Sequence, residues 1–201
     1  VAKFDSSLQF EWARVSNASI YPGNGYGSLR MGGLHAMPDE SLVMGCSGGS
    51  YPLYFDSLEI GPSIIDLAYD NGFAVKYSPN GEVKWGKRFS PTDGLSQVNA
   101  LCGDGLGNTY VCLYGGEFAF PDQPNIQNFV VSKIDSLGNT IWNKGSDNGP
   151  GSITFFTTQI KEDGRGNVFV AGGYANKFGP SPVFGSTTLP WFGDVFWIHI
   201  L

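Results

Sequence analysis

Residues 74–89 read AVKYSPNGEVKWGKRF, and two further copies of this stretch occur in the chain. They are VAKFDSSLQFEWARV at residues 1–15 and VSKIDSLGNTIWNKG at residues 131–145, while FWIHIL at residues 196–201 begins a fourth copy. The positions that recur are a lysine (Lys3, Lys76, Lys133, with His199 in the fourth copy) and a tryptophan (Trp12, Trp85, Trp142). Repeats at such intervals are typical of stacked units, each too small to bury its own apolar face.

The segments between the copies predict hairpins. QVNALCGD at 97–104 is followed by a Gly-rich turn and then by TYVCLYGG at 109–116, and TTQIKED at 157–163 leads through a similar turn into VFVAGGY at 168–174. Gly and Asn tolerate the positive φ that tight hairpin turns require. In the first unit this turn is degenerate, and a long insertion, SGGSYPLYFDSLEIGPSIIDLAYDN, follows it.

A third strand in each unit contains the recurrent lysine. Two-residue alternation places three sets of residues on one face of their strands, with the recurrent lysine on the other face. The sets are Phe73, Val75 and Tyr77, then Val130, Ser132 and Ile134, then Phe196, Ile198 and Ile200. Each unit is therefore expected to be four short antiparallel strands, formed by two hairpins and the loop between them.

Four-stranded sheets that repeat at this spacing favour an all-β fold of β-propeller blades. In strand order we expect half a blade at 1–15, a blade at 28–90, a blade at 95–146 and most of a blade at 153–201. This is an incomplete ring of about three blades. A sandwich and a β-solenoid are the alternatives, but a sandwich normally alternates more cleanly between apolar and polar residues. An open end exposes strand edges, so we expect that the piece alone is not a stable monomer.

The composition agrees with short strands and tight turns. The chain of 201 residues contains 29 Gly, aromatics are 14% and charged residues 15%, against about a quarter in average domains. The net charge is −6, and no Lys/Arg cluster is present, which argues against a nucleic-acid partner.

No apolar run is long enough for a transmembrane helix, so we expect no membrane insertion by this segment. The chain begins and ends in mid-strand, which we interpret as a piece of a longer polypeptide.

Three cysteines, Cys46, Cys102 and Cys112, cannot all pair with one another. If the hairpin at 97–116 folds symmetrically about Leu106, Cys102 faces Tyr110 rather than Cys112. We therefore expect three small buried hydrophobic residues, with a diagonal disulfide as the alternative. No metal-binding spacing such as C-x-x-C occurs.

The stretches FAVKYSPNGEVKWGKRF, EDGRGNVFVAGGY and FGPSPVFGSTTLPWFGDVFWIHI resemble the SBBP-type bacterial β-propeller repeat family. The resemblance extends over nearly the whole chain. It implies a secreted or cell-surface bacterial protein, often one with adhesion or sensory modules. The insertion in the first unit and His199 in the lysine position depart from the family pattern.

Two groups of aromatic residues are candidates for separate roles. Trp12, Trp85 and Trp142 recur at a fixed position and are expected in the core between units. The variable loops contain the candidate ligand-binding residues Tyr51, Tyr54, Phe118, Phe120, Trp191 and Phe192. Loops commonly carry binding residues, and flat aromatic faces bind sugars or partner proteins. The alternative is that these rings pack over the edge of their own blade.

Residues for catalysis or metal binding are few. His35, with Asp39, Glu40 and Ser41 nearby, could act as a general base, but no nucleophile-elbow motif surrounds Ser28 or Ser41. The turns Asp104–Asn108 and Asp163–Asn167 resemble calcium loops but offer one carboxylate each. An Asp that accepts hydrogen bonds from its own turn explains them equally well. We expect no cofactor, no catalytic residue and no metal site.

The sequence predicts a non-catalytic propeller segment that serves as a scaffold or protein-interaction module, located extracellularly or on the bacterial surface. Its expected partners are other blades of the same protein or partner proteins, with glycans as a further possibility. Two alternatives stay open. One is a carbohydrate-binding module that uses the aromatic loops, and the other is part of a propeller hydrolase or lyase.

Overall fold

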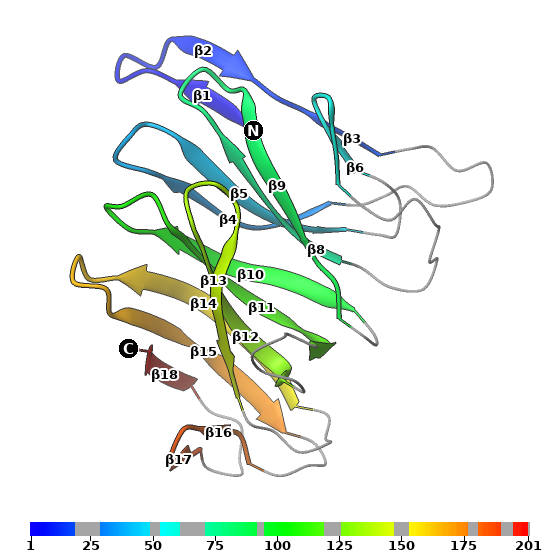
Figure 1. Cartoon of the computed structure of the whole chain (residues 1–201), viewed down its shortest axis with the longest axis vertical. Helices are drawn as coiled ribbons and strands as arrows, with labels where there is room; N and C mark the ends of the chain where they lie inside the picture. Colours follow the sequence, from blue (N-terminus) through cyan, green and yellow to red (C-terminus); the bar gives the residue numbers. More distant parts are fainter. Residues whose placement is uncertain are drawn as a thin grey trace, which may run out of the picture.

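The chain forms antiparallel β-sheets, and its described residues contain no helix (Figure 1). The computed structural model describes residues 1–18, 29–48, 53–60, 71–91, 95–118, 126–146, 153–176, 181–189 and 195–200. The strands are β1 (Ala2–Phe4), β2 (Phe10–Ala13), β3 (Ser16–Ala18), β4 (Arg30–Ala36), β5 (Leu42–Gly48), β6 (Leu53–Phe55), β7 (Leu58–Ile60), β8 (Asn71–Tyr77), β9 (Val83–Phe89), β10 (Ser96–Gly103), β11 (Thr109–Phe118), β12 (Ile126–Ile134), β13 (Thr140–Gly145), β14 (Ile153–Glu162), β15 (Val168–Asn176), β16 (Val183–Phe184), β17 (Thr187–Thr188) and β18 (Val195–Ile200).

Two of the sheets have the predicted four strands in chain order, β4-β5-β8-β9 and β10-β11-β12-β13. A three-stranded sheet, β14-β15-β18, follows them, and the two-stranded β1-β2 precedes them. The expectation of antiparallel all-β units is therefore confirmed. The sheets are not closed into a ring.

Two short hairpins were not expected from the sequence. β6 and β7, inside the insertion of the first unit, pair with each other, and β6 also pairs with β3. β16 pairs with β17 in the third loop. Both hairpins turn through two residues, Asp56-Ser57 and Gly185-Ser186, with positive φ at Asp56 (53°) and Gly185 (57°). Such two-residue turns connect neighbouring strands closely. The insertion is thus partly a small sheet of its own.

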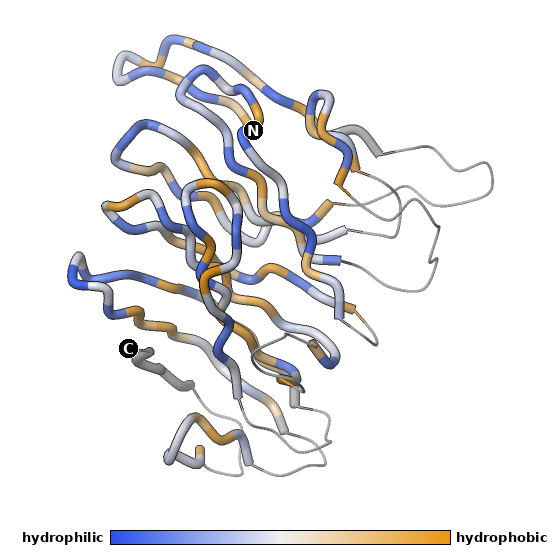
Figure 2. Tube along the Cα trace, viewed as in Figure 1, coloured by the Kyte–Doolittle hydropathy of each residue, from blue (hydrophilic) through white to orange (hydrophobic). Residues whose placement is uncertain are grey.

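Three apolar cores lie between successive sheets, so the β4–β9 and β10–β13 sheets are each covered on both faces. The first core contains Met44, Cys46, Leu53, Phe55, Ile60, Phe73, Val75 and Tyr77. The second contains Met37, Val43, Ala74, Trp85, Phe89, Val98, Leu101, Val111, Leu113, Phe118, Ile126, Val130 and Ile134. The third contains Ala100, Cys102, Tyr110, Cys112, Phe129, Val131, Phe155, Ile160, Val168, Val170 and Tyr174. Figure 2 shows apolar residues spread along the strands of every sheet rather than gathered in one layer.

The two sides of a strand therefore face different cores. Phe73, Val75 and Tyr77 lie in the first core, as their predicted common face requires, whereas Ala74 of the same strand lies in the second. Burial of apolar area at each face stabilises the stack by roughly 25 cal/mol per Å². No unit could bury both faces alone.

Glycines let the first strands of neighbouring sheets approach closely. A Cβ atom at Gly32 in β4 would lie 1.8 Å from the carbonyl oxygen of Val98 in β10, and one at Gly45 in β5 would lie 2.5 Å from Val98 Cγ1. β10 in turn packs against β14. The first strands β4, β10 and β14 therefore run side by side through the stack.

Candidate functional site

Six hairpin turns share one geometry and lie on the same side of the stack (Figure 1). In each, the first residue's N–H donates to the carbonyl of the fifth, and in most the fourth residue's N–H donates to the carbonyl of the first. The turns are Asp5–Gln9, Met37–Ser41, Ser78–Glu82, Asp104–Asn108, Asp135–Asn139 and Asp163–Asn167. The fourth residue has positive φ in all of them, including Leu8 (60°) and Glu40 (62°), where no glycine is present. The first unit's turn is therefore degenerate in sequence but not in geometry.

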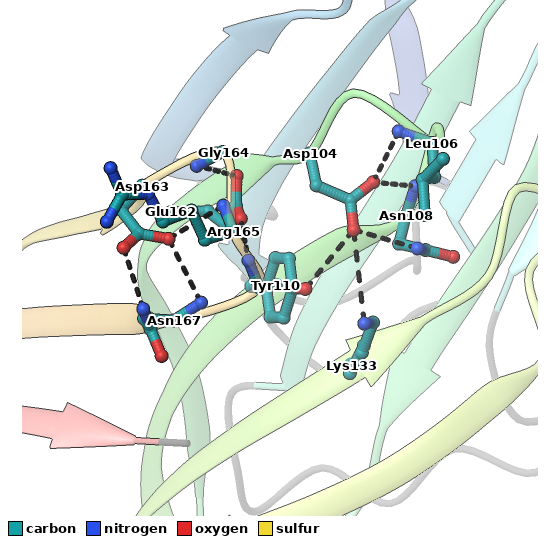
Figure 3. Close-up of polar contacts among 11 residues, drawn as sticks. Asp104, Leu106, Asn108, Tyr110, Lys133, Glu162, Asp163, Gly164, Arg165 and Asn167 are labelled. Carbon is teal, nitrogen blue, oxygen red and sulfur yellow. Dashed lines mark hydrogen bonds and ion pairs between the residues drawn. The ribbon is translucent and has the colours of Figure 1, made fainter.

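The aspartates of these turns bind their own turn, as the non-calcium interpretation predicted. The Asp104 carboxylate accepts hydrogen bonds from the N–H groups of Leu106 and Asn108, both at 2.9 Å, and from Asn108 Nδ2 at 2.8 Å (Figure 3). Asp163 accepts the equivalent bonds from Arg165 and Asn167. No group of three or more His, Cys, Asp or Glu residues in the described part of the chain could hold a metal ion.

These hydrogen bonds set the acidity of the turns. Burial by itself raises the pKa of Asp104, but hydrogen bonds from Asn108, Leu106 and Tyr110 outweigh it and hold the pKa below the usual value. The hydrogen bond from Asn167 likewise lowers the pKa of Asp163. A carboxylate that accepts several hydrogen bonds favours its charged form. Each of these groups is therefore an ionised turn residue rather than a proton donor.

The recurrent lysines and tryptophans are directly paired across their hairpins. Lys3 lies opposite Trp12, Lys76 opposite Trp85 and Lys133 opposite Trp142. Lys133 Nζ lies 3.9 Å from Asp104 Oδ2 and 5.0 Å from the centre of the Tyr110 ring. Lys76 is buried, and its Nζ donates to the carbonyl of Gly107 at 3.5 Å, in the next sheet. Lys76 and Lys133 thus both contact the turn Asp104–Asn108.

Each tryptophan of the first two copies rests on a turn of the following sheet. Trp12 Nε1 donates to the carbonyl of Pro79 at 2.8 Å, and Trp85 Nε1 donates to that of Ser136 at 3.2 Å. The rings cover Gly81 and Gly138, where a Cβ atom would lie 2.7 Å from Trp12 and 2.9 Å from Trp85. We call this arrangement the Trp–Gly contact.

The three tryptophans, which were expected in the core, are buried to different extents. Trp85 is 8% exposed and belongs to the second core. Trp12 and Trp142 are partly buried and pack against the first and third cores. Trp142 also lies beside Tyr110, with ring centres 6.0 Å apart. All three rings therefore face apolar residues.

Of the six aromatic loop candidates, the described residues include Tyr54 and Phe118, which lie in different sheets. Tyr51, Phe120, Trp191 and Phe192 lie outside the described residues. Tyr54 lies in β6 and is half-buried. Phe118 requires a correction, because it ends β11 and is 1% exposed in the second core. Phe55, next to Tyr54 in β6, and Phe184 in β16 also pack inward, which agrees with rings that cover their own blade.

The three cysteines are buried, and both histidines lie in strands. Cys102 faces Tyr110, as predicted, and all three cysteines are free and buried. Burial raises the pKa of Cys46 and Cys102 to about 12, so their nucleophilic thiolate forms are suppressed. His35 lies in β4 opposite Val43, and burial lowers its pKa. His199 lies in β18 opposite Phe169.

Grooves are present on the surface of the described residues. One, of about 620 Å³, lies between the end of β2, the turn between β6 and β7, and the start of β9. Arg14 and Asp56 line it and form an ion pair at 3.5 Å. Another, of about 260 Å³, lies where β4, β10 and β14 meet. We call it the first-strand groove.

Comparisons with known proteins add little. No family model matches the chain, and no curated protein matches it. A crystal structure of a protein of unknown function from Bacteroides caccae is similar at 11% identity, with a TM-score of 0.30. The match covers 82% of this chain and 64% of that one. A similarity of this size carries no argument about function. No helix in the described residues is long and apolar enough to span a membrane.

Proposed function

We propose that the chain is a non-catalytic scaffold segment of stacked β-propeller blades that works through contacts with other blades or partner proteins. The observation that carries this proposal is the Trp–Gly contact. It occurs twice in succession, so that the β4-β5-β8-β9 sheet receives the Trp12 ring from the preceding unit and gives the Trp85 ring to the following one. A geometry that repeats from unit to unit can accept further units of the same kind.

The chemistry of the described side chains supports a structural role. The aspartates of the turns are held by turn hydrogen bonds, and the cysteines are buried with raised pKa values. These groups serve the fold itself, in contrast to the convergent sets of titratable residues found in active sites. The resemblance to the SBBP-type repeat and the extracellular or cell-surface location belong to the same proposal.

The outer face of the β1-β2 hairpin is where we place a partner sheet. Phe4 is 54% exposed, although its repeat equivalents Tyr77 and Ile134 are 2% and 0% exposed. Phe10, its partner across the hairpin, is also exposed, and the two rings are in edge contact at 6.0 Å. Tyr77 is covered by Trp12 from the preceding unit, with ring centres 6.2 Å apart. Phe4 is therefore an aromatic residue at a position that is buried in the other units, but no described ring of a preceding unit covers it as Trp12 covers Tyr77.

Sedimentation velocity over a range of concentrations tests this proposal. We expect the chain to self-associate and Phe4→Asp to shift it toward the monomer, because a carboxylate cannot be buried cheaply at an apolar contact. Leu137→Asp is the matched control, since Leu137 is an exposed apolar residue at a turn tip, and it should leave association unchanged. A wild-type chain that stays monomeric and unfolds cooperatively would refute the proposal.

A further inference from the structure

The first-strand groove is formed by three successive sheets. Arg30 and Met31 line it from β4, Gln97 and Asn99 from β10, and Phe156 from β14. Its volume of about 260 Å³ lies just below the range of ~300–1,000 Å³ typical of drug-sized ligands. The groove therefore suits a ligand of roughly one ring.

The first strand of each of the three sheets around the groove contains a register shift, which is a β-bulge or a similar irregularity in the pairing with the second strand. The register shifts between Met31 and Gly33 in β4, between Val98 and Ala100 in β10, and between Thr157 and Gln159 in β14. Bulges of this kind redirect side chains and end regular pairing.

Two hydrogen bonds hold the groove wall in place. Ser47 Oγ accepts from the N–H of Val98 at 2.8 Å, and Asn99 Nδ2 donates to the carbonyl of Phe155 at 3.4 Å. They tie β5 to β10 and β10 to β14. The wall is thus formed before any ligand arrives.

The charge around the groove is opposite to that of the whole chain. The net charge is −6, yet the described segments 29–37, 95–103 and 153–161 contain no Asp or Glu. Arg30 is exposed and forms no ion pair with any described residue. A guanidinium binds a carboxylate through two parallel hydrogen bonds. The groove therefore favours an anionic ligand, and a carboxylate in particular.

The remaining lining residues add a flat apolar surface and neutral hydrogen-bonding groups. Phe156 is 55% exposed and Met31 is 60% exposed. Gln97 and Asn99 each carry an amide that can both donate and accept. A sugar ring matches this mixture, because its C–H face packs on an aromatic ring while its hydroxyls bond to amides.

We propose that the first-strand groove binds a small acidic sugar of the uronic acid class. Its carboxylate pairs with Arg30, its hydroxyls bond to Gln97 and Asn99, and its ring packs against Phe156. The site lies apart from the aromatic loops and from the Phe4 face. It therefore does not depend on the proposed scaffold function, and the Phe4→Asp experiment leaves it unaffected.

Isothermal titration calorimetry at low salt, with glucuronate and galacturonate as probes, tests the site. We expect both acids to bind at least tenfold more tightly than glucose and galactose. Arg30→Gln should remove this preference while leaving the melting temperature unchanged, because Arg30 forms no ion pair with the described residues. Phe156→Ala should weaken all four sugars alike. Arg165→Gln is the matched control, since Arg165 is exposed in the turn between β14 and β15, and it should bind as the wild type does.

Further titrations distinguish a free sugar from a sugar unit within a glycan as the ligand. Trigalacturonate binding more tightly than galacturonate would support a site for a glycan, and equal binding would support a site for the free sugar. Benzoate binding as tightly as the uronates would overturn the role of the amides. Equal binding of acidic and neutral sugars, an unchanged preference in Arg30→Gln, or no uronate binding at about 10 mM would each overturn the proposal.

Discussion

At the scale of single residues, the Trp–Gly contact predicts that two chemically identical substitutions differ in cost. Gly138 and Gly166 have φ of 94° and 93°, so alanine is strained at both, by about 1–2 kcal/mol. A Cβ at Gly138 would lie 2.9 Å from Trp85, whereas Gly166 has no atom within 4 Å. We expect Gly138→Ala to destabilise the chain by a further ~1–3 kcal/mol, the usual cost of overpacking.

Urea unfolding followed by tryptophan fluorescence measures this difference directly. Gly166→Ala serves as the control for backbone strain alone, since both substitutions share the left-handed conformation. Equal free energies of unfolding for the two variants would show that Trp85 does not depend on close contact with the turn. In that case the ring could not hold neighbouring sheets together.

The positions of some residues could be predicted from the sequence, and the positions of others could not. Cys102 faces Tyr110, and Val75 and Tyr77 share a core, because strand alternation and a symmetric hairpin determine both outcomes locally. Phe118 was expected in a loop. It is buried because β11 runs on past Gly115, through a register shift. No local signal marks such a shift, since it depends on the partner strand.

At the scale of elements, hairpin turns were predictable only where glycine marked them. The turn Met37–Ser41 has the same hydrogen bonds as the others, but Glu40 occupies its left-handed position. The hairpins β6-β7 and β16-β17 were missed for a different reason. Their strands have only two or three residues, too few for alternation to be seen, although FDSL and FGST carried turn residues in the right places.

The same turn gives a prediction of increased stability. Glu40→Gly should raise the free energy of unfolding by about 0.5–1 kcal/mol, since glycine adopts positive φ without steric cost. The Lys3–Glu40 ion pair at 3.7 Å is exposed, so its loss matters little. Glu40→Ala is the matched control, because it removes the carboxylate but keeps the strained backbone, and it should bring no gain. A Glu40→Gly variant no more stable than Glu40→Ala would contradict the prediction.

At the scale of the whole molecule, we expect the free energy of local unfolding of each sheet to increase with the number of apolar cores to which that sheet contributes. The β10–β13 sheet lies between the second and third cores, while the β1-β2 hairpin reaches only the first, through Val1 and Trp12. In a stack with contacts only between neighbours, opening a central unit breaks two interfaces and opening a terminal unit breaks one. Native-state hydrogen exchange should therefore show slowest exchange in β11 and β12 and fastest exchange in β1 and β2. Uniform protection across all sheets would mean that the chain unfolds only as a whole, and the units would then be one cooperative domain rather than a stack.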